Sequence, residues 1–136
     1  MLKLLDVQKG QSVLEIGSGS GYVLALLAEI VGTSGRIYGV EIIKELAERL
    51  QAKLGNYQNI RATNESGSNG LIRYAPYERI LISASCPSVP MHLAEQLAET
   101  GIIVASVKNS IVKIAKEKNK TFIREYPGFV FVPLRE

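Results

Sequence analysis

VLEIGSGSGY, residues 13–22, joins a short apolar run to a longer one through a loop with three glycines. Residues 12–16 predict a strand, and residues 22–31, which are apolar and rich in Leu and Ala, predict a helix. Glycines let the main chain turn tightly and let a ligand approach it closely. A loop between such a strand and helix lies at the carboxyl edge of an α/β sheet, where these folds bind their ligands. We therefore expect a binding site at this loop.

Strands and helices continue to alternate beyond the loop. The further predicted strands are residues 36–40, 59–63, 79–83 and 101–107, the predicted helices are residues 42–54 and 87–98, and residues 64–69 predict a polar loop. Such alternation implies parallel strands joined by right-handed crossovers. After residue 107 it stops, because residues 110–115 and 121–132 both predict strands. The expected fold class is α/β, a doubly wound, mostly parallel sheet with a C-terminal antiparallel hairpin.

Length and composition narrow the class of protein. A chain of 136 residues with 46% hydrophobic and 21% charged residues predicts one packed domain over residues 1–136. The net charge of +3 gives no indication that nucleic acid is a partner, and one Cys with one His does not predict a metal cluster. The chain has no apolar run of membrane-spanning length, and its opening run is too short for a signal peptide. We expect a cytoplasmic protein with no membrane partner.

The spacing of the loop separates two nucleotide ligands. A dinucleotide fingerprint would place its third glycine at position 22, which is Tyr22, whereas the glycine falls at Gly21. This spacing, with Glu15 two positions before the first glycine, is the pattern of S-adenosylmethionine sites and disfavours an NAD-linked oxidoreductase. Glu41 follows the second predicted strand, where a carboxylate can accept hydrogen bonds from ribose hydroxyls. Its alternative role is a favourable charge at a helix N-terminus.

The glycine segment and several other stretches resemble the protein-L-isoaspartate O-methyltransferase family. The others are residues 26–32 (LLAEIVG), residues 35–38 (GRIY) with Glu41, residues 75–80 (APYERI), the segment of Pro87 and Pro90, and residues 131–135 (FVPLR). The resemblance extends over nearly the whole chain. It implies a Rossmann-like class I methyltransferase that transfers a methyl group from S-adenosyl-L-methionine to the free carboxylate of an isoaspartyl residue in a damaged protein or peptide.

The resemblance also implies which residues bind the cofactor. The glycine loop would line the methionine end, and Glu41 would hold the ribose. Where the family has Gly-Asp-Gly after the third strand, this chain has Glu65-Ser66-Gly67, so either Glu65 or Ser66 substitutes for the carboxylate near the adenine. The candidate cofactor contacts are Glu15, Gly17, Ser18, Gly19, Gly21, Tyr22, Glu41, Glu65, Ser66 and Gly67.

The catalytic residues are less well indicated. An acceptor carboxylate is already ionised at neutral pH, so the reaction needs no general base. Ser85 could offer a hydroxyl to the acceptor, although a serine after a strand commonly bonds to backbone groups. The segment around it lacks the Asn or Asp and the aromatic residue of many enzymes that methylate nucleic acid bases. We expect Cys86 to be a buried apolar residue and His92 to lie on a helix surface.

The family also carries a segment upstream of the first strand, with a Ser or Thr hydroxyl near the reacting carboxylate and much of the substrate-binding wall. Because the first predicted strand begins at Ser12, we expect this chain to lack that segment. Two functions therefore remain open. One is a methyltransferase that is shortened or that depends on a partner chain, and the other is a noncatalytic domain of the same fold. A homo-oligomer would follow if the missing segment left an apolar surface exposed.

Overall fold

The computed structural model describes residues 1–129 and builds them around one seven-stranded sheet with the order β3-β2-β1-β4-β5-β6-β7. The strands are β1 (Ser12–Ile16), β2 (Arg36–Glu41), β3 (Ile60–Asn64), β4 (Tyr77–Cys86), β5 (Leu97–Val107), β6 (Ser110–Glu117) and β7 (Lys120–Pro127). The helices are α1 (Leu2–Leu5), α2 (Tyr22–Val31) and α3 (Lys44–Leu54), with two 3₁₀ segments, η1 (Ile72–Tyr74) and η2 (Met91–Gln96). Strands β1 to β5 pair in parallel, and β5, β6 and β7 pair antiparallel. The predicted fold class is confirmed.

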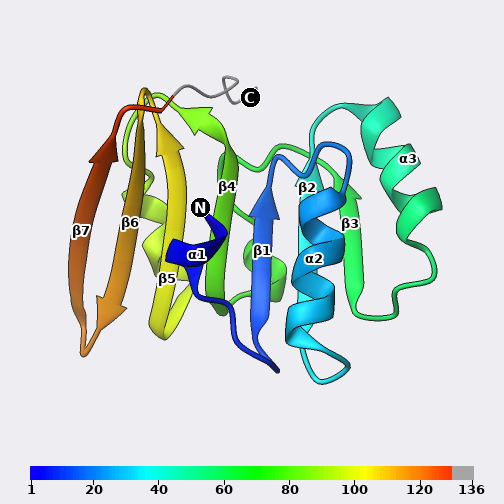
Figure 1. Cartoon of the computed structure of the whole chain (residues 1–136), viewed down its shortest axis with the longest axis horizontal. Coiled ribbons are helices and arrows are strands. Elements are labelled where there is room, and N and C mark those ends of the chain that lie inside the picture. The colour runs from blue at the N-terminus through cyan, green and yellow to red at the C-terminus, as the bar shows by residue number, and fades with distance from the viewer. Residues whose placement is uncertain (130–136) are drawn as a thin grey trace.

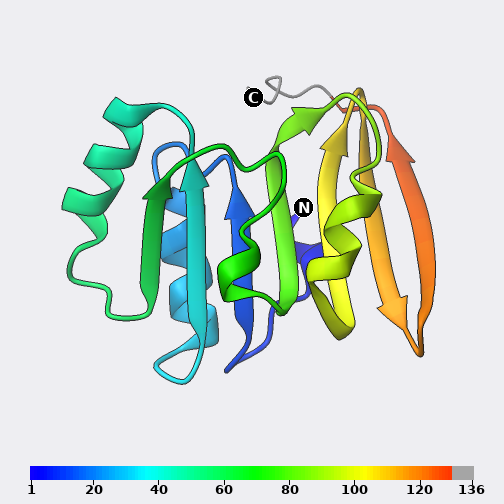
Figure 2. The ribbon, with the colours of Figure 1, turned by 180° about the vertical axis from the view of Figure 1, so that it is seen from behind.

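Both faces of the sheet are covered. In Figure 1 the three α-helices lie on the side turned to the viewer, and the reverse view in Figure 2 shows η1 and η2 on the other side. Alternate residues of β1 enter two different cores: Val13 packs with Leu24 of α2, whereas Leu14 and Ile16 pack with Leu93 of η2. Burial on both faces explains why the central strands are nearly continuous apolar runs.

The predicted helix over residues 87–98 is wrong. The structure has a short 3₁₀ segment, η2, and β5 begins at Leu97, four residues before its predicted start. Leu97 pairs with Tyr77 of β4 and is buried. It therefore belongs to the sheet, although the apolar spacing predicts it within a helix. The side chain of Gln96 bonds to the loop before β4, which fixes the chain at the end of η2.

Other differences lie at element ends. Strand β4 is longer than the predicted residues 79–83, and α3 begins at Lys44 rather than at residue 42. Strand β7 ends at Pro127, and part of the predicted strand at 121–132, like the FVPLR stretch, lies outside the described residues. Within residues 1–129, no helix has the length and apolar character needed to cross a membrane.

Candidate functional site

The loop after β1 lies where the strand order reverses. From β1 the chain proceeds to β2 and β3 on one side, and then crosses to β4 and β5 on the other. The carboxyl ends of β1 and β4 therefore border a crevice, which is the usual ligand position in doubly wound sheets. The main chain of the loop is tied to the end of β2, because the amides of Gly17 and Ser18 both donate to the carbonyl of Val40, at 2.9 and 3.2 Å.

Two glycines of the loop have different surroundings. Gly19 has a φ of +53°, and a Cβ built on it would lie within 4 Å of no described atom, so space is open beside its main chain. Gly21 has a φ of +82°, and a Cβ there would collide with the side chain of Leu50. Gly19 can therefore receive a ligand, whereas Gly21 is also required for packing the loop against α3.

Glu41 lies directly against the glycine loop. Its side chain is buried, and its Oε2 accepts a hydrogen bond from the amide of Gly19 at 2.8 Å, while Oε1 accepts one from the amide of Ile43 at 3.0 Å. Asn64 reinforces this turn by donating to the carbonyl of Glu41 at 2.9 Å. Each carboxylate oxygen has a second lone pair, so Glu41 can still accept hydrogen bonds from a ligand.

Glu15 is the most deeply buried acid of the site, with 1% of its surface exposed. Its Oε1 accepts a hydrogen bond from Ser83 Oγ at 2.7 Å, and among the described residues Oε2 has no partner. Burial raises the pKa of this carboxyl to about 8, despite the opposing hydrogen bond from Ser83. A buried acceptor without a partner is costly in a folded protein. A cationic group entering the site would supply that partner.

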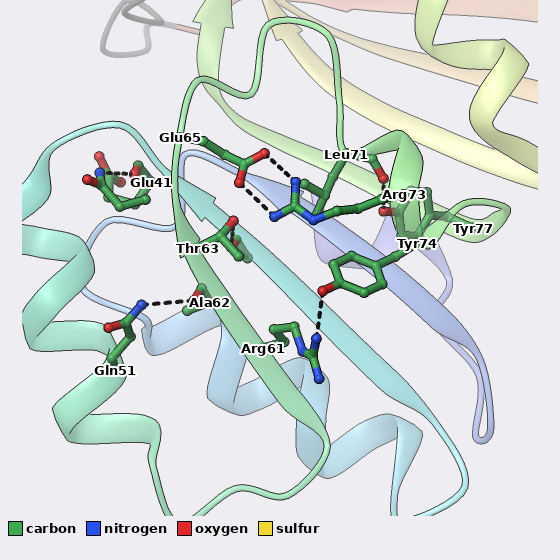
Figure 3. A network of polar contacts seen from close by, with 12 residues as sticks. Glu41, Gln51, Arg61, Ala62, Thr63, Glu65, Leu71, Arg73, Tyr74 and Tyr77 are labelled. Carbon is green, nitrogen blue, oxygen red and sulfur yellow. Dashed lines mark hydrogen bonds and ion pairs between the residues drawn. The ribbon is translucent and has the colours of Figure 1, made fainter.

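Residues 65–67 reach the same edge from β3. Gly67 presses on the side chain of Ile16, with no room for a Cβ, and Ser66 Oγ lies 3.0 Å from Ser68 Oγ. Glu65 instead points to Arg73, as Figure 3 shows, and both of its oxygens accept hydrogen bonds from that guanidinium. A pocket of about 130 Å³ lies beside this segment, lined by Ile16, Gly67, Ser68, Cys86, Pro87 and His92 among others.

The remaining predicted residues lie at the margin of this arrangement. Tyr22 is the first residue of α2 and is 67% exposed. Ser85 donates to the carbonyl of Lys108 at 3.3 Å, so its hydroxyl is engaged with the backbone. Cys86 is buried as expected, and burial raises the pKa of its thiol. His92 is exposed on η2 rather than on an α-helix, and its Nε2 lies 2.8 Å from the carbonyl of Ser68.

Two residues of the site were missed by sequence reasoning. Ser83 could have been found from strand register, because Glu15 pairs with Leu81 and the residue two positions later shares its face. Arg73 lies in an irregular segment, where no periodic pattern indicates its partner. Within residues 1–129, no group of three or more acidic, His or Cys side chains is placed to hold a metal ion.

Comparison with known proteins identifies the family. All of residues 1–136 match the model of the protein-L-isoaspartate(D-aspartate) O-methyltransferase (PCMT) family. The chain belongs to this family. Its family relatives include the protein-L-isoaspartate O-methyltransferase of Methanococcus maripaludis strain C5, which is 40% identical over 139 residues covering 98% of this chain and 66% of that protein. Protein-L-isoaspartate O-methyltransferase 2 of Archaeoglobus fulgidus is 40% identical over 141 residues, covering 99% of this chain and 64% of that protein. The chain thus spans about two thirds of the length of these curated family members.

Solved structures agree on the fold. A protein-L-isoaspartate O-methyltransferase superposes with a TM-score of 0.89 at 23% identity, covering 99% of this chain and 45% of the other. A Plasmodium falciparum structure, described as a β-aspartate methyltransferase (PCMT) in complex with S-adenosyl-L-homocysteine, superposes with a TM-score of 0.82 at 19% identity. It covers 98% of this chain and 69% of the other.

Proposed function

We propose that this chain is the S-adenosyl-L-methionine-binding portion of a carboxyl O-methyltransferase that acts on isoaspartyl residues of damaged proteins or peptides. The observation that carries the proposal is the position of Glu41, whose carboxylate is bonded to the amide of Gly19 at the point where the loop opens to space. The names of the curated relatives supply the reaction, and the site supplies a place for its methyl donor.

The residues present fit the three parts of S-adenosyl-L-methionine. The unpartnered Oε2 of Glu15 suits its ammonium group, and the free lone pairs of Glu41 suit its ribose hydroxyls. The main chain at Gly17, Ser18 and Gly19 would line the methionine end, with Gly21 and Tyr22 following at the start of α2. Residues 65–67 would lie on the adenine side. When bound, the cofactor supplies an activated methyl group on a sulfonium.

The chain's own contribution is orientation and exclusion of water. The acceptor carboxylate needs no base, so the site has to hold acceptor and donor in line about 3 Å apart, an arrangement worth several kcal/mol. Ser85 remains a candidate for contacting the acceptor, and it would have to exchange the Lys108 carbonyl for that partner.

Calorimetric titration with S-adenosylhomocysteine tests the cofactor assignment. We expect measurable binding to the wild-type chain and roughly ten- to a hundredfold weaker binding to Glu41→Ala, because hydrogen bonds to a carboxylate are lost. Glu48→Ala is the matched control, since Glu48 is an exposed acid on α3. No binding to the wild-type chain would reject the assignment.

Methyl transfer to an isoaspartyl peptide, compared with its aspartyl isomer, tests the reaction. Selective turnover of the isoaspartyl peptide is expected, and equal or zero turnover would reject this reaction for the chain.

The alternative function, a partner-dependent or noncatalytic domain, is favoured by an apolar stripe on α2. Tyr22, Leu26 and Ile30 recur every fourth residue there and are 67, 36 and 45% exposed. Light scattering would reveal self-association.

The setting of the protein is part of the same proposal. We place the chain in the cytoplasm, as one domain over residues 1–136, acting on protein or peptide rather than on nucleic acid. The free thiol of Cys86 is compatible with a reducing compartment. Cell fractionation with an antibody to the chain is the direct measurement, and recovery in an extracellular fraction would contradict it.

A further inference from the structure

A tyrosine-centred network lies on the face of the sheet opposite α2. Tyr74 stacks on Tyr38 with ring centroids 4.6 Å apart and planes inclined by 16°. Arg61, from β3, donates from Nη1 to the Tyr74 hydroxyl at 2.6 Å, and its guanidinium lies 5.1 Å from the ring centroid. The guanidinium of Arg73 lies 5.3 Å from the same centroid. Figure 3 shows the two arginines at different sides of this ring. The stack therefore anchors the segment before β4 to the sheet.

Arg73 uses this anchored position to hold Glu65. Its Nη1 donates to Glu65 Oε1 at 2.8 Å and its Nη2 donates to Oε2 at 2.7 Å. The guanidinium fork and the carboxylate match in geometry, which makes a two-point contact more directional than a single ion pair. The hydrogen bonds from Arg73 lower the pKa of Glu65, so the carboxylate is charged at neutral pH. Both of its oxygens face Arg73 rather than the crevice.

The segment after Glu65 forms one wall of the site. Gly67 rests on Ile16, and Gly67 and Ser68 line the pocket of about 130 Å³. The far end of this segment is also held, because His92 Nε2 lies at the carbonyl of Ser68 and Gln96 donates to the carbonyl of Asn69 at 2.7 Å. The Glu65–Arg73 contact supplies the restraint at the near end.

We propose that Arg73 is a positioning residue for cofactor binding, because it holds residues 66–68 in place through its contact with Glu65. In this arrangement Glu65 is bonded to Arg73 and does not contact the adenine. Of Glu65 and Ser66, Ser66 is then the one left to contact the base. The proposal rests on the proposed function, because it concerns the same cofactor. It decides between the two residues that the resemblance left open.

Titration with S-adenosylhomocysteine across a double-mutant cycle tests this proposal. We expect Glu65→Gln and Arg73→Gln each to weaken binding roughly two- to threefold, and the double variant to be no worse than either, because they break the same contact. The exchanged pair, Glu65→Arg with Arg73→Glu, should recover affinity. Arg73→Lys should recover part of it, because Lys keeps the charge without the fork. Arg36→Gln is the matched control, since Arg36 is exposed at the start of β2 and bonds to the carbonyls of Thr33 and Gly35, away from Glu65.

The outcomes separate the proposal from the proposed function. Normal binding by all Glu65 and Arg73 variants would overturn the positioning role and leave the cofactor assignment intact. Loss in Glu65→Gln alone, without recovery in the exchanged pair, would mean that Glu65 contacts the ligand directly and would also overturn it. No binding by the wild-type chain would overturn both the positioning role and the cofactor assignment.

Hydrogen exchange gives a second measurement without ligand. The amide of Gly70, bonded to the carbonyl of Gly67 at 2.9 Å, should exchange faster in Arg73→Gln than in Arg36→Gln. Unchanged exchange would contradict the proposed restraint.

Discussion

Glu15 lies near the carboxyl end of β1 and Glu65 directly follows β3, and their surroundings shift their pKa values in opposite directions. Glu15 is 1% exposed, has one oxygen without a described partner, and has a pKa raised by burial. The side chain of Glu65 is 35% exposed, has both oxygens bonded to Arg73, and has a pKa lowered by that contact. The buried region thus holds a carboxyl with one unpartnered oxygen, whereas the exposed region holds a carboxylate that is already paired. Changes in the buried region should cost far more.

The largest effect is expected at Gly21. An alanine there would adopt a left-handed backbone at φ +82° and would meet Leu50, so Gly21→Ala should lower the free energy of unfolding by about 3 kcal/mol. Gly19→Ala is the control, because φ is +53° but the space beside it is open, and about 1 kcal/mol is expected. Urea unfolding measures both. Equal losses would show that Leu50 moves aside without cost.

These two glycines also show how far the sequence could lead. The bounds of the first strand and of α2 match their predictions, because a local apolar run and a glycine loop determine them. The glycine spacing does not say that Gly21 packs on α3, since that contact joins segments about 30 positions apart in the chain. The helix predicted for residues 87–98 is wrong for the same reason, because the pairing of Leu97 with Tyr77 outweighs a helical apolar pattern.

The site divides similarly. Glu41 was predicted from its position at the end of the second strand, and it does lie at the glycine loop, whereas its role toward ribose stays a prediction. The partner of Glu65 could not be predicted, because Arg73 is exposed and lies in a segment without regular spacing. The position of a side chain on a strand of the sheet can be predicted from the sequence, whereas the position of a side chain in an irregular loop cannot.

The second prediction uses the pH dependence of stability. The raised pKa of Glu15 means that the folded chain keeps a proton that the unfolded chain releases at lower pH. The free energy of unfolding should therefore fall by about 1 kcal/mol per pH unit between roughly pH 5 and 8. Glu15→Gln should remove this slope, and Glu29→Gln, at an exposed acid of α2, should keep it. Urea unfolding at several pH values measures this slope. An unchanged slope in Glu15→Gln would mean that another group holds the proton.

The same carboxyl predicts the pH dependence of ligand binding. To receive an ammonium group, Glu15 must lose its proton, so affinity for S-adenosylhomocysteine should rise as pH increases toward about 8. Binding near neutral pH should then release a proton, and calorimetry in buffers of different ionisation enthalpy measures that release. Glu15→Gln should bind more weakly and release none. Proton release that persists in this variant would point to another group.

A smaller effect is expected at Tyr77 on the opposite face. Its ring is fully buried, and its hydroxyl donates to the carbonyl of Leu71. Tyr77→Phe should lower the free energy of unfolding by about 1 kcal/mol, because a buried carbonyl loses its donor. Tyr74→Phe removes a hydroxyl of the same kind from the half-buried ring beside Arg61, where water can replace it, and no resolvable change is expected. Comparable losses in both variants would mean that the Tyr74 network is as rigid as the core.

The smallest effect should come from the charge of Glu65, with a sign opposite to that of Glu15. A lowered pKa stabilises the folded chain above the ordinary carboxyl range, and this contribution is lost as pH falls through the folded value. Because the pair is exposed, solvent screening limits it to a few tenths of a kcal/mol. Wild type and Glu65→Gln should therefore differ slightly in urea unfolding at pH 6 and converge in acid. Salt should narrow the difference at pH 6, as for the exposed Lys44–Glu48 pair. A difference that is large and independent of salt would mean that Glu65 is as desolvated as Glu15, and the contrast between the two regions would then fail.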